Sequence, residues 1–206
     1  MSGYPVPAKK HSAEIEIKKS RFLAFAHPID SREQAMAIVA DYKAAYPDAR
    51  HHCWAYQLGD PACAYNAGMD DDGEPSGTAG KPILNVLSHK DVGDVLVVVV
   101  RYFGGVKLGA GGLTRAYAQS AQAVMETLPV IEKVAMVTIQ VRGDFACEQW
   151  LRHQAAQFDA EVAAVDYGQT VCVTLHWPEA SWPEFEAMLE GQASIEHWKR
   201  MDEPST

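Results

Sequence analysis

Residues 70–117 read DDDGEPSGTAGKPILNVLSHKDVGDVLVVVVRYFGGVKLGAGGLTRAY, and they carry the clearest structural signal in the chain. At its centre, residues 95–100 are all Val or Leu, with no polar alternation. A strand of this kind is buried on both faces, so we expect it in the middle of a sheet. A glycine-rich loop lies at each end of this region, and binding chemistry is expected in these two loops.

The chain divides at Pro129. After it, the pattern predicts the order strand, helix, strand, strand, helix, strand. That βαββαβ order is typical of a ferredoxin-like domain. We therefore expect an α+β protein with two domains, residues 1–128 and 129–206, and a loose tail at residues 1–12.

The composition is that of an ordinary globular protein, with 48% hydrophobic and 22% charged residues. No segment is long and apolar enough to cross a bilayer, so we expect a cytoplasmic protein without membrane contact. The four cysteines, at 53, 63, 147 and 172, include no C-x-x-C pair. This spacing argues against a disulfide framework and a structural zinc site.

The net charge of −9 is unevenly distributed. Residues 1–128 contain 13 Lys and Arg against 14 Asp and Glu, whereas residues 129–206 contain 5 against 13. Acidic surfaces disfavour phosphate backbones, because binding to them depends on Lys and Arg. Any contact with nucleic acid is therefore expected in the first domain.

The second glycine loop, residues 101–115, combines exposed backbone amides with the start of a long helix. Amides and a helix N-terminus attract anions, and Arg101, Lys107 and Arg115 add positive charge. The loop is not a Walker A motif, and Thr114 stands where a dinucleotide fingerprint needs its third glycine.

The first glycine loop, residues 72–82, also lacks the Walker A ending, because Pro82 follows Gly80-Lys81. Its hydroxyl groups and lysine can still donate to a phosphate or a carboxylate. The acidic residues 70–72 and Glu74 have the oxygen ligands that a divalent ion prefers. A solvated acidic turn is the commoner case, so no metal and no cofactor are predicted.

The two loops together define one candidate surface, although glycines in tight turns are often purely structural. A β-branched residue at Gly104 or Gly111 is expected to destabilise the protein or to block binding. The predicted anion or nucleic-acid site comprises Glu74, Ser76, Gly77, Thr78, Gly80, Lys81, Arg101, Gly104, Gly105, Lys107, Gly109, Gly111, Gly112 and Arg115.

His51, His52 and Cys53 lie together on a predicted strand, where neighbouring side chains point to opposite faces. A cysteine–histidine nucleophile pair is conceivable there, but no third, orienting group is identifiable. A buried structural cysteine is the commoner case, and no catalytic residue is assigned.

Two long motifs carry a resemblance to a known family. Residues 71–83 read DDGEPSGTAGKPI, and residues 101–113 read RYFGGVKLGAGGL. On these motifs the chain resembles the bacterial branch of the IMPACT family, over nearly its whole length. The resemblance implies a first domain like domain IV of elongation factor G and a second like its ferredoxin-like domain V. It also implies a link to translational control, in which the eukaryotic relatives act, and it brings no catalytic residues.

The leading hypothesis is a non-catalytic binding protein of translation regulation. It would contact RNA, the ribosome or a translation factor, with phosphate contacts from Lys81, Arg101, Lys107 and Arg115. The alternatives are an enzyme acting on a small phosphate-bearing substrate and a peptide-binding adaptor. An enzyme needs an acid or base within reach of the ligand, and Glu74, Asp72 and His52 are the candidates.

Overall fold

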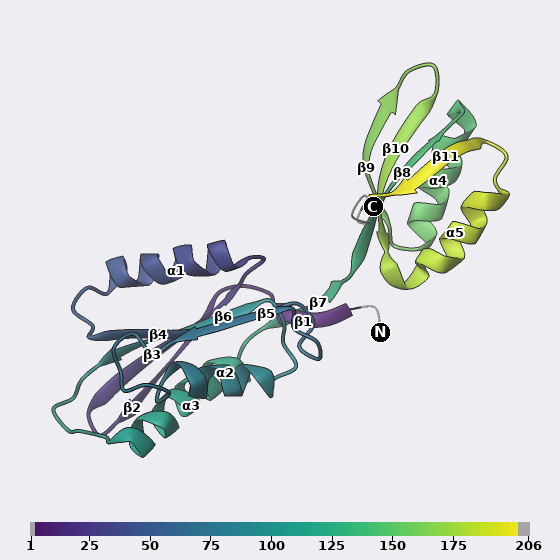
Figure 1. The fold of residues 1–206 in the computed structure, drawn as a ribbon. Helices are drawn as coiled ribbons and strands as arrows, with labels where there is room; N and C mark the ends of the chain where they lie inside the picture. Colours follow the sequence, from purple (N-terminus) through teal and green to yellow (C-terminus); the bar gives the residue numbers. More distant parts are fainter. Residues whose placement is uncertain (1–2, 202–206) are drawn as a thin grey trace. The chain divides into compact units, whose positions relative to one another are not determined.

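The computed structural model describes residues 3–201. The chain forms two compact α+β units, one made of residues 4–133 and the other of the chain from residue 134 onward together with Gly3. Figure 1 shows the elements of both units. Among residues 3–201 there are five α-helices, and none is long and apolar enough to cross a membrane.

The first unit is built on a five-stranded sheet with the order β2-β3-β6-β4-β5, in which every neighbouring pair is antiparallel. The expected apolar strand is the central one. The strands are β2 (His11–Ile17), β3 (Ser20–Pro28), β4 (His51–Leu58), β5 (Asn66–Asp70) and β6 (Val95–Tyr102).

Strand β6 is buried on both faces because helices cover both sides of the sheet (Figure 1). Its odd-numbered valines, from Val95 to Val99, pack with helices α2 (Gly80–Ser88) and α3 (Ala110–Glu126). The even-numbered side chains pack on the other face with helix α1 (Arg32–Ala45). An unbroken Val and Leu run therefore serves two separate cores, as burial on both faces requires.

Residues 3–7 form strand β1 (Gly3–Pro7), so the expectation of a loose tail at residues 1–12 is wrong within the described residues. Strand β1 pairs with β7 (Val130–Val134), far away in sequence, and β2 already begins at His11. The first compact unit consequently continues past Pro129 to Lys133.

Asp94 joins β1, β7 and the turn after β4. Its carboxylate accepts hydrogen bonds from the Tyr4 hydroxyl (2.8 Å) and the Gly59 amide (2.7 Å), and it pairs with Lys133. Burial favours the neutral acid, but the hydrogen bonds from Lys133, Gly59 and Tyr4 outweigh it and lower the pKa of Asp94. This carboxylate therefore holds β7 to the first unit.

The second unit has the order βαββαβ, and all neighbouring strands in its sheet are antiparallel, in the order β11-β8-β10-β9. Val, Ile and Leu side chains of the sheet pack with the two helices around the buried Trp177. The elements are β8 (Met136–Gly143), α4 (Phe145–Gln157), β9 (Glu161–Tyr167), β10 (Val171–Pro178), a 3-10 turn at Glu179–Ser181, α5 (Trp182–Gly191) and β11 (Ile195–Arg200).

Candidate functional site

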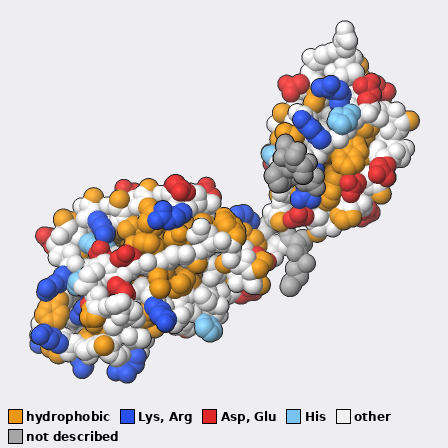
Figure 2. Space-filling view, in the orientation of Figure 1, with side chains coloured by type: hydrophobic (Ala, Val, Ile, Leu, Met, Phe, Trp, Pro, Cys, Tyr) orange, Lys and Arg blue, Asp and Glu red, His pale blue; other side chains and the backbone are white. Residues whose placement is uncertain are grey.

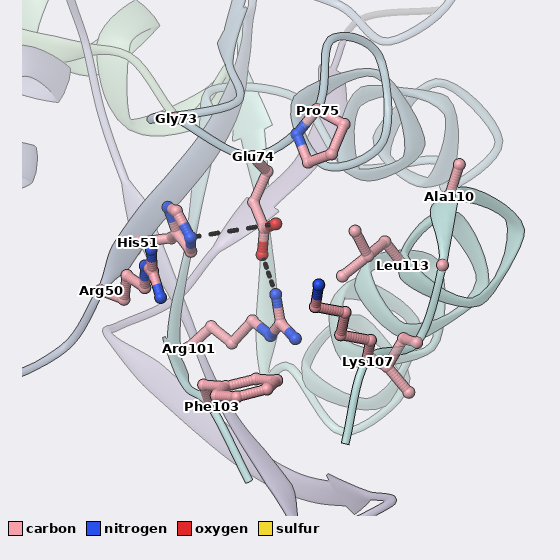
Figure 3. Close-up of a pocket in the computed structure, with 12 residues that line it drawn as sticks. Arg50, His51, Gly73, Glu74, Pro75, Arg101, Phe103, Lys107, Ala110 and Leu113 are labelled. Carbon is pink, nitrogen blue, oxygen red and sulfur yellow. Dashed lines mark hydrogen bonds and ion pairs between the residues drawn. The ribbon is translucent and has the colours of Figure 1, made fainter. Parts of the chain in front are cut away.

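A pocket of about 360 Å³ lies at the end of β6, between the two glycine loops. Pairing of β4 with β6 places His51 directly opposite Arg101, so both side chains point to the same face as the odd-numbered valines. Figure 3 shows these side chains around the pocket. The lining residues are Arg50, His51, Gly73, Glu74, Pro75, Arg101, Phe103, Lys107, Leu108, Gly109, Ala110 and Leu113.

The carboxylate of Glu74 and the guanidinium of Arg101 form a buried ion pair in the wall of this pocket. Oxygen Oε1 of Glu74 accepts from Nη1 of Arg101 and from the Tyr117 hydroxyl, the latter at 2.8 Å. Both charged residues are more than nine-tenths buried. A buried charge without its partner is strongly destabilising, so each group keeps the other in place.

Arg101 has hydrogen-bond donors that the described residues do not use. Among residues 3–201, its Nε and Nη2 atoms have no hydrogen-bond partner, and Nε is fully buried. Buried donors in native proteins are nearly always satisfied. The guanidinium is thus fixed by Glu74 on one side and has unused hydrogen-bonding capacity on the other.

The imidazole of His51 lies beside the Glu74 carboxylate (Figure 3). Its Nδ1 lies 2.8 Å from the carbonyl oxygen of Asp72, which can only accept, so Nδ1 carries the proton. Nε2 lies 3.9 Å from Oε2 of Glu74, too far for a hydrogen bond. At this distance Oε2 accepts no hydrogen bond from His51, and the two groups form an ion pair only when the imidazole is protonated.

The start of helix α3 and two cations form the rim of the pocket. Gly109 has a φ of 71°, a left-handed conformation that favours glycine, and no side chain caps the helix that begins after it. Lys107 and Arg50 have no side-chain hydrogen bond or ion pair within the described part of the chain. Free helix amides and two unpaired cations suit an anion.

Lys and Arg side chains also gather more widely at this end of the first unit. Figure 2 shows them over the region where the loop before α3 lies in Figure 1. The sheet end beside the loop contributes two exposed lysines from the β2–β3 turn, Lys18 and Lys19. A positive field over this end favours the approach of anionic partners.

The first glycine loop differs from expectation, because its amides are already occupied by the chain's own Asp71. The carboxylate of Asp71 accepts from the amides of Gly77 (2.7 Å), Ala79 (2.9 Å) and Gly80 (2.8 Å). Burial raises the pKa of Asp71, but the three amide hydrogen bonds outweigh burial and lower it. This loop is closed by an internal carboxylate, and its amides are not available to an external anion.

The neighbouring acidic residue is also engaged. Asp72 accepts from Lys43 (2.6 Å) and from the backbone amide of His52 (2.6 Å). Within residues 3–201 no group of three or more His, Cys, Asp or Glu side chains has an arrangement suited to a metal ion. The acidic run therefore holds the loop against α1 and β4.

Cys53 is not exposed to the pocket as a nucleophile. The side chain is fully buried, and its sulfur lies 3.0 Å from the carbonyl oxygen of Asp71 and 3.3 Å from the Tyr117 hydroxyl. Burial raises the pKa of the thiol far above its usual range, so the nucleophilic thiolate is absent at neutral pH. His52 lies on the other face of β4 and contacts the carbonyl oxygen of Tyr46.

Of the fourteen residues predicted from the sequence, the structure brings only four to the pocket lining, Glu74, Arg101, Lys107 and Gly109. Lys81 and Arg115 are exposed but do not line it. The remaining eight, which also lie outside the lining, are Ser76, Gly77, Thr78, Gly80, Gly104, Gly105, Gly111 and Gly112. Sequence reasoning missed Arg50 and His51, which reach the pocket because β4 pairs with β6, and Phe103, which lies within the second glycine loop itself.

The Impact N-terminal domain model matches residues 18–125, a range that contains both glycine loops and all twelve pocket residues. A protein of Haemophilus influenzae described as an IMPACT family member is 34% identical over 194 residues, which cover 94% of either chain. The chain belongs to the IMPACT family.

A second bacterial relative and two solved structures are also similar to this chain. The family member YigZ of Escherichia coli is 36% identical over 189 residues, 92% of this chain and 93% of YigZ. A crystal structure described as that of a hypothetical protein is 34% identical and covers 99% of this chain and 100% of its own, with a TM-score of 0.75. A structure described as the two-domain translational regulator Yih1 is 28% identical over 57% of this chain and 46% of its own, with a TM-score of 0.39.

Proposed function

We propose that this IMPACT-family protein is a non-catalytic binding protein of translation regulation. It holds a phosphate group of RNA, either free or within the ribosome, in the pocket at the end of β6. The link to translation is what the resemblance to the IMPACT family implies, because the eukaryotic members of the family act in translational control. The choice of a phosphate as the bound group rests on the chemistry of the pocket.

The observation that carries the proposal is the set of unused donors that converge on one pocket. Nη2 of Arg101 has no hydrogen-bond partner among residues 3–201, and Lys107 and the uncapped start of α3 line the same pocket. Arginine, lysine and helix amides are the groups that bind phosphates in proteins. Since Glu74 balances the charge of Arg101, the surplus positive charge of the pocket comes from Arg50 and Lys107.

The fold is consistent with such a role. We infer that the first unit corresponds to domain IV of elongation factor G and that the second is a ferredoxin-like domain corresponding to domain V. The βαββαβ order and the strand order β11-β8-β10-β9 support the second assignment. A cytoplasmic location, where RNA and ribosomes are found, is part of the same proposal.

The test is a salt titration of binding to a labelled single-stranded RNA. Affinity should fall with salt, with a slope in log affinity against log salt of roughly −0.7 for each phosphate contact. Lys107→Ala should weaken binding and make the slope less negative by about 0.7. Lys81→Ala removes the same charge from an exposed site outside the pocket and should leave the slope unchanged.

Three outcomes would argue against the proposal. A flat salt dependence in the unmodified protein would mean that phosphates are not the binding groups. Equal losses for Lys107→Ala and Lys81→Ala would mean that binding depends on overall charge and not on the pocket. Turnover of the RNA or of a small phosphate ester, abolished by changes in the pocket, would favour an enzyme instead.

A further inference from the structure

One oxygen of the Glu74 carboxylate, Oε2, accepts no hydrogen bond from the described residues and lies 3.9 Å from Nε2 of His51. The other oxygen, Oε1, accepts two hydrogen bonds. The side chain is only 4% exposed, and the residue lines the pocket. Solvent in the pocket can hydrate Oε2, which is not among the fully buried atoms, but a ligand that displaces this solvent leaves a charged acceptor without compensation unless it brings a donor. A ligand that fills this pocket must therefore offer a donor as well as an anion.

A phosphate group alone does not meet this requirement. The phosphodiester in an RNA backbone carries oxygens that only accept, so it suits Lys107 and the amides of α3 but cannot donate to Glu74. The ribose 2′-hydroxyl lies next to the 3′-phosphate in the same nucleotide and is both donor and acceptor. It is also the group that distinguishes RNA from DNA.

Phe103 offers a surface for the base. Its side chain is 45% exposed although it lines the pocket, and the Arg101 guanidinium lies 5.7 Å from its ring centre. Exposed aromatic rings beside cations are the usual stacking platform for single-stranded nucleic acids. The pocket volume of about 360 Å³ suits one nucleotide unit and not a longer segment.

We propose that the pocket selects a single ribonucleotide unit over a deoxyribonucleotide, with Glu74 Oε2 accepting a hydrogen bond from the 2′-hydroxyl. Lys107 and the start of α3 hold the adjacent phosphate, and the base lies against Phe103. The negative charge of Glu74 does not repel the phosphate, because Arg101 is paired with it in the same wall. This inference rests on the proposed function and adds the selectivity for ribose.

The experiment compares three hexamers of adenosine that differ only at the 2′-position: ribose, deoxyribose and 2′-fluoro. The unmodified protein should bind the ribose hexamer about tenfold or more tightly than the other two, because a hydrogen bond to a charged group is lost in both. Glu74→Gln should reduce this ratio. Glu14→Gln, a matched loss of one exposed carboxylate outside the pocket, should leave the ratio unchanged.

The outcomes separate this inference from the function on which it rests. Equal affinity for the three hexamers, with Lys107→Ala weakening each of them, would overturn ribose selection and leave phosphate binding intact. Failure of all three hexamers to bind would overturn the proposed function and this inference with it. If Glu74→Gln does not fold, the comparison of the ribose and 2′-fluoro hexamers on the unmodified protein still tests whether the 2′-hydroxyl donates a hydrogen bond.

Discussion

Gly104 lies directly against the backbone of Lys19, so a β-carbon at position 104 would overlap the Lys19 carbonyl group. The Gly104 amide also donates to the Ser20 hydroxyl at 3.1 Å. Together these contacts hold the end of β6 and the second glycine loop against the β2–β3 turn. The position of the pocket-lining Phe103, one residue earlier, depends on this close approach.

Gly104→Ala should consequently destabilise the protein. The added methyl group must displace backbone, and we expect a loss of about 1–3 kcal/mol in the free energy of unfolding. Gly111→Ala is the matched control, because a β-carbon there meets no atom within 4 Å. Thermal melts of both variants measure the difference, and equal melting temperatures would contradict the role of Gly104.

The same comparison shows why glycine roles are hard to read from sequence. The pattern predicts a cost of substitution at both Gly104 and Gly111, and the structure shows a steric reason only at Gly104. Close approach of a glycine to a distant turn is a tertiary contact, and nothing in the local sequence marks it. The central strand, in contrast, was predictable because residues 95–100 carry their own signal of burial on two faces.

Some pocket residues were likewise predictable from the local sequence, and others were not. Arg101 and Lys107 were predictable because they lie within the glycine-rich motif itself. His51 was not, since it reaches the pocket only through its register opposite Arg101. The sequence around Asp71 predicts a solvated acidic turn, whereas in the structure its carboxylate binds amides six to nine residues later in the chain. Such loop closure depends on the folded backbone and not on spacing.

The stabilising effect of Asp71 should depend on pH. Its pKa is lower in the folded protein than the value of about 3.9 in the unfolded chain, so the charged form is favoured by folding. That contribution is complete above the unfolded pKa and is lost as pH falls through the folded pKa. Asp71→Asn should cost about 1 kcal/mol at pH 7, and the cost should shrink in acid.

Urea denaturation of Asp71→Asn and the unmodified protein at neutral pH and near pH 2.5, roughly 1.5 pH units below the unfolded Asp pKa, measures this effect. Asp91→Asn is the control, because Asp91 is exposed and has no hydrogen bond or ion pair with any residue from 3 to 201. The prediction is wrong if Asp71→Asn is as stable as Asp91→Asn at pH 7, or if its deficit is the same at both pH values.

Thiol reactivity should follow burial. Cys63 is exposed, whereas Cys53 and Cys147 are buried, and burial raises the pKa of both buried thiols. A maleimide reagent should therefore label Cys63 within the folded protein and reach Cys53 only after unfolding. Peptide mapping after brief labelling, with and without denaturant, gives the order. Rapid labelling of Cys53 in the folded protein would revive its role as a nucleophile.

The last prediction concerns where the first domain ends. Lys133 pairs with the buried Asp94, and β7 pairs with β1, so residues 129–133 belong structurally to the part of the chain that precedes them. A fragment ending at residue 134 should fold cooperatively, and a fragment ending at residue 128 should melt at a lower temperature. The shorter fragment exposes one edge of β1 and leaves the Asp94 carboxylate without its lysine.

Lys133→Ala in the longer fragment separates the loss of the Lys133–Asp94 ion pair from the loss of the pairing between β7 and β1. Lys133 is about half exposed in its side chain, so its ion pair contributes only part of the loss. We expect Lys133→Ala to melt between the two fragments, and the remaining difference then belongs to the pairing of β7 with β1. If the fragments ending at 128 and 134 melt at the same temperature, β7 adds nothing to the first unit, and Pro129 is the better boundary.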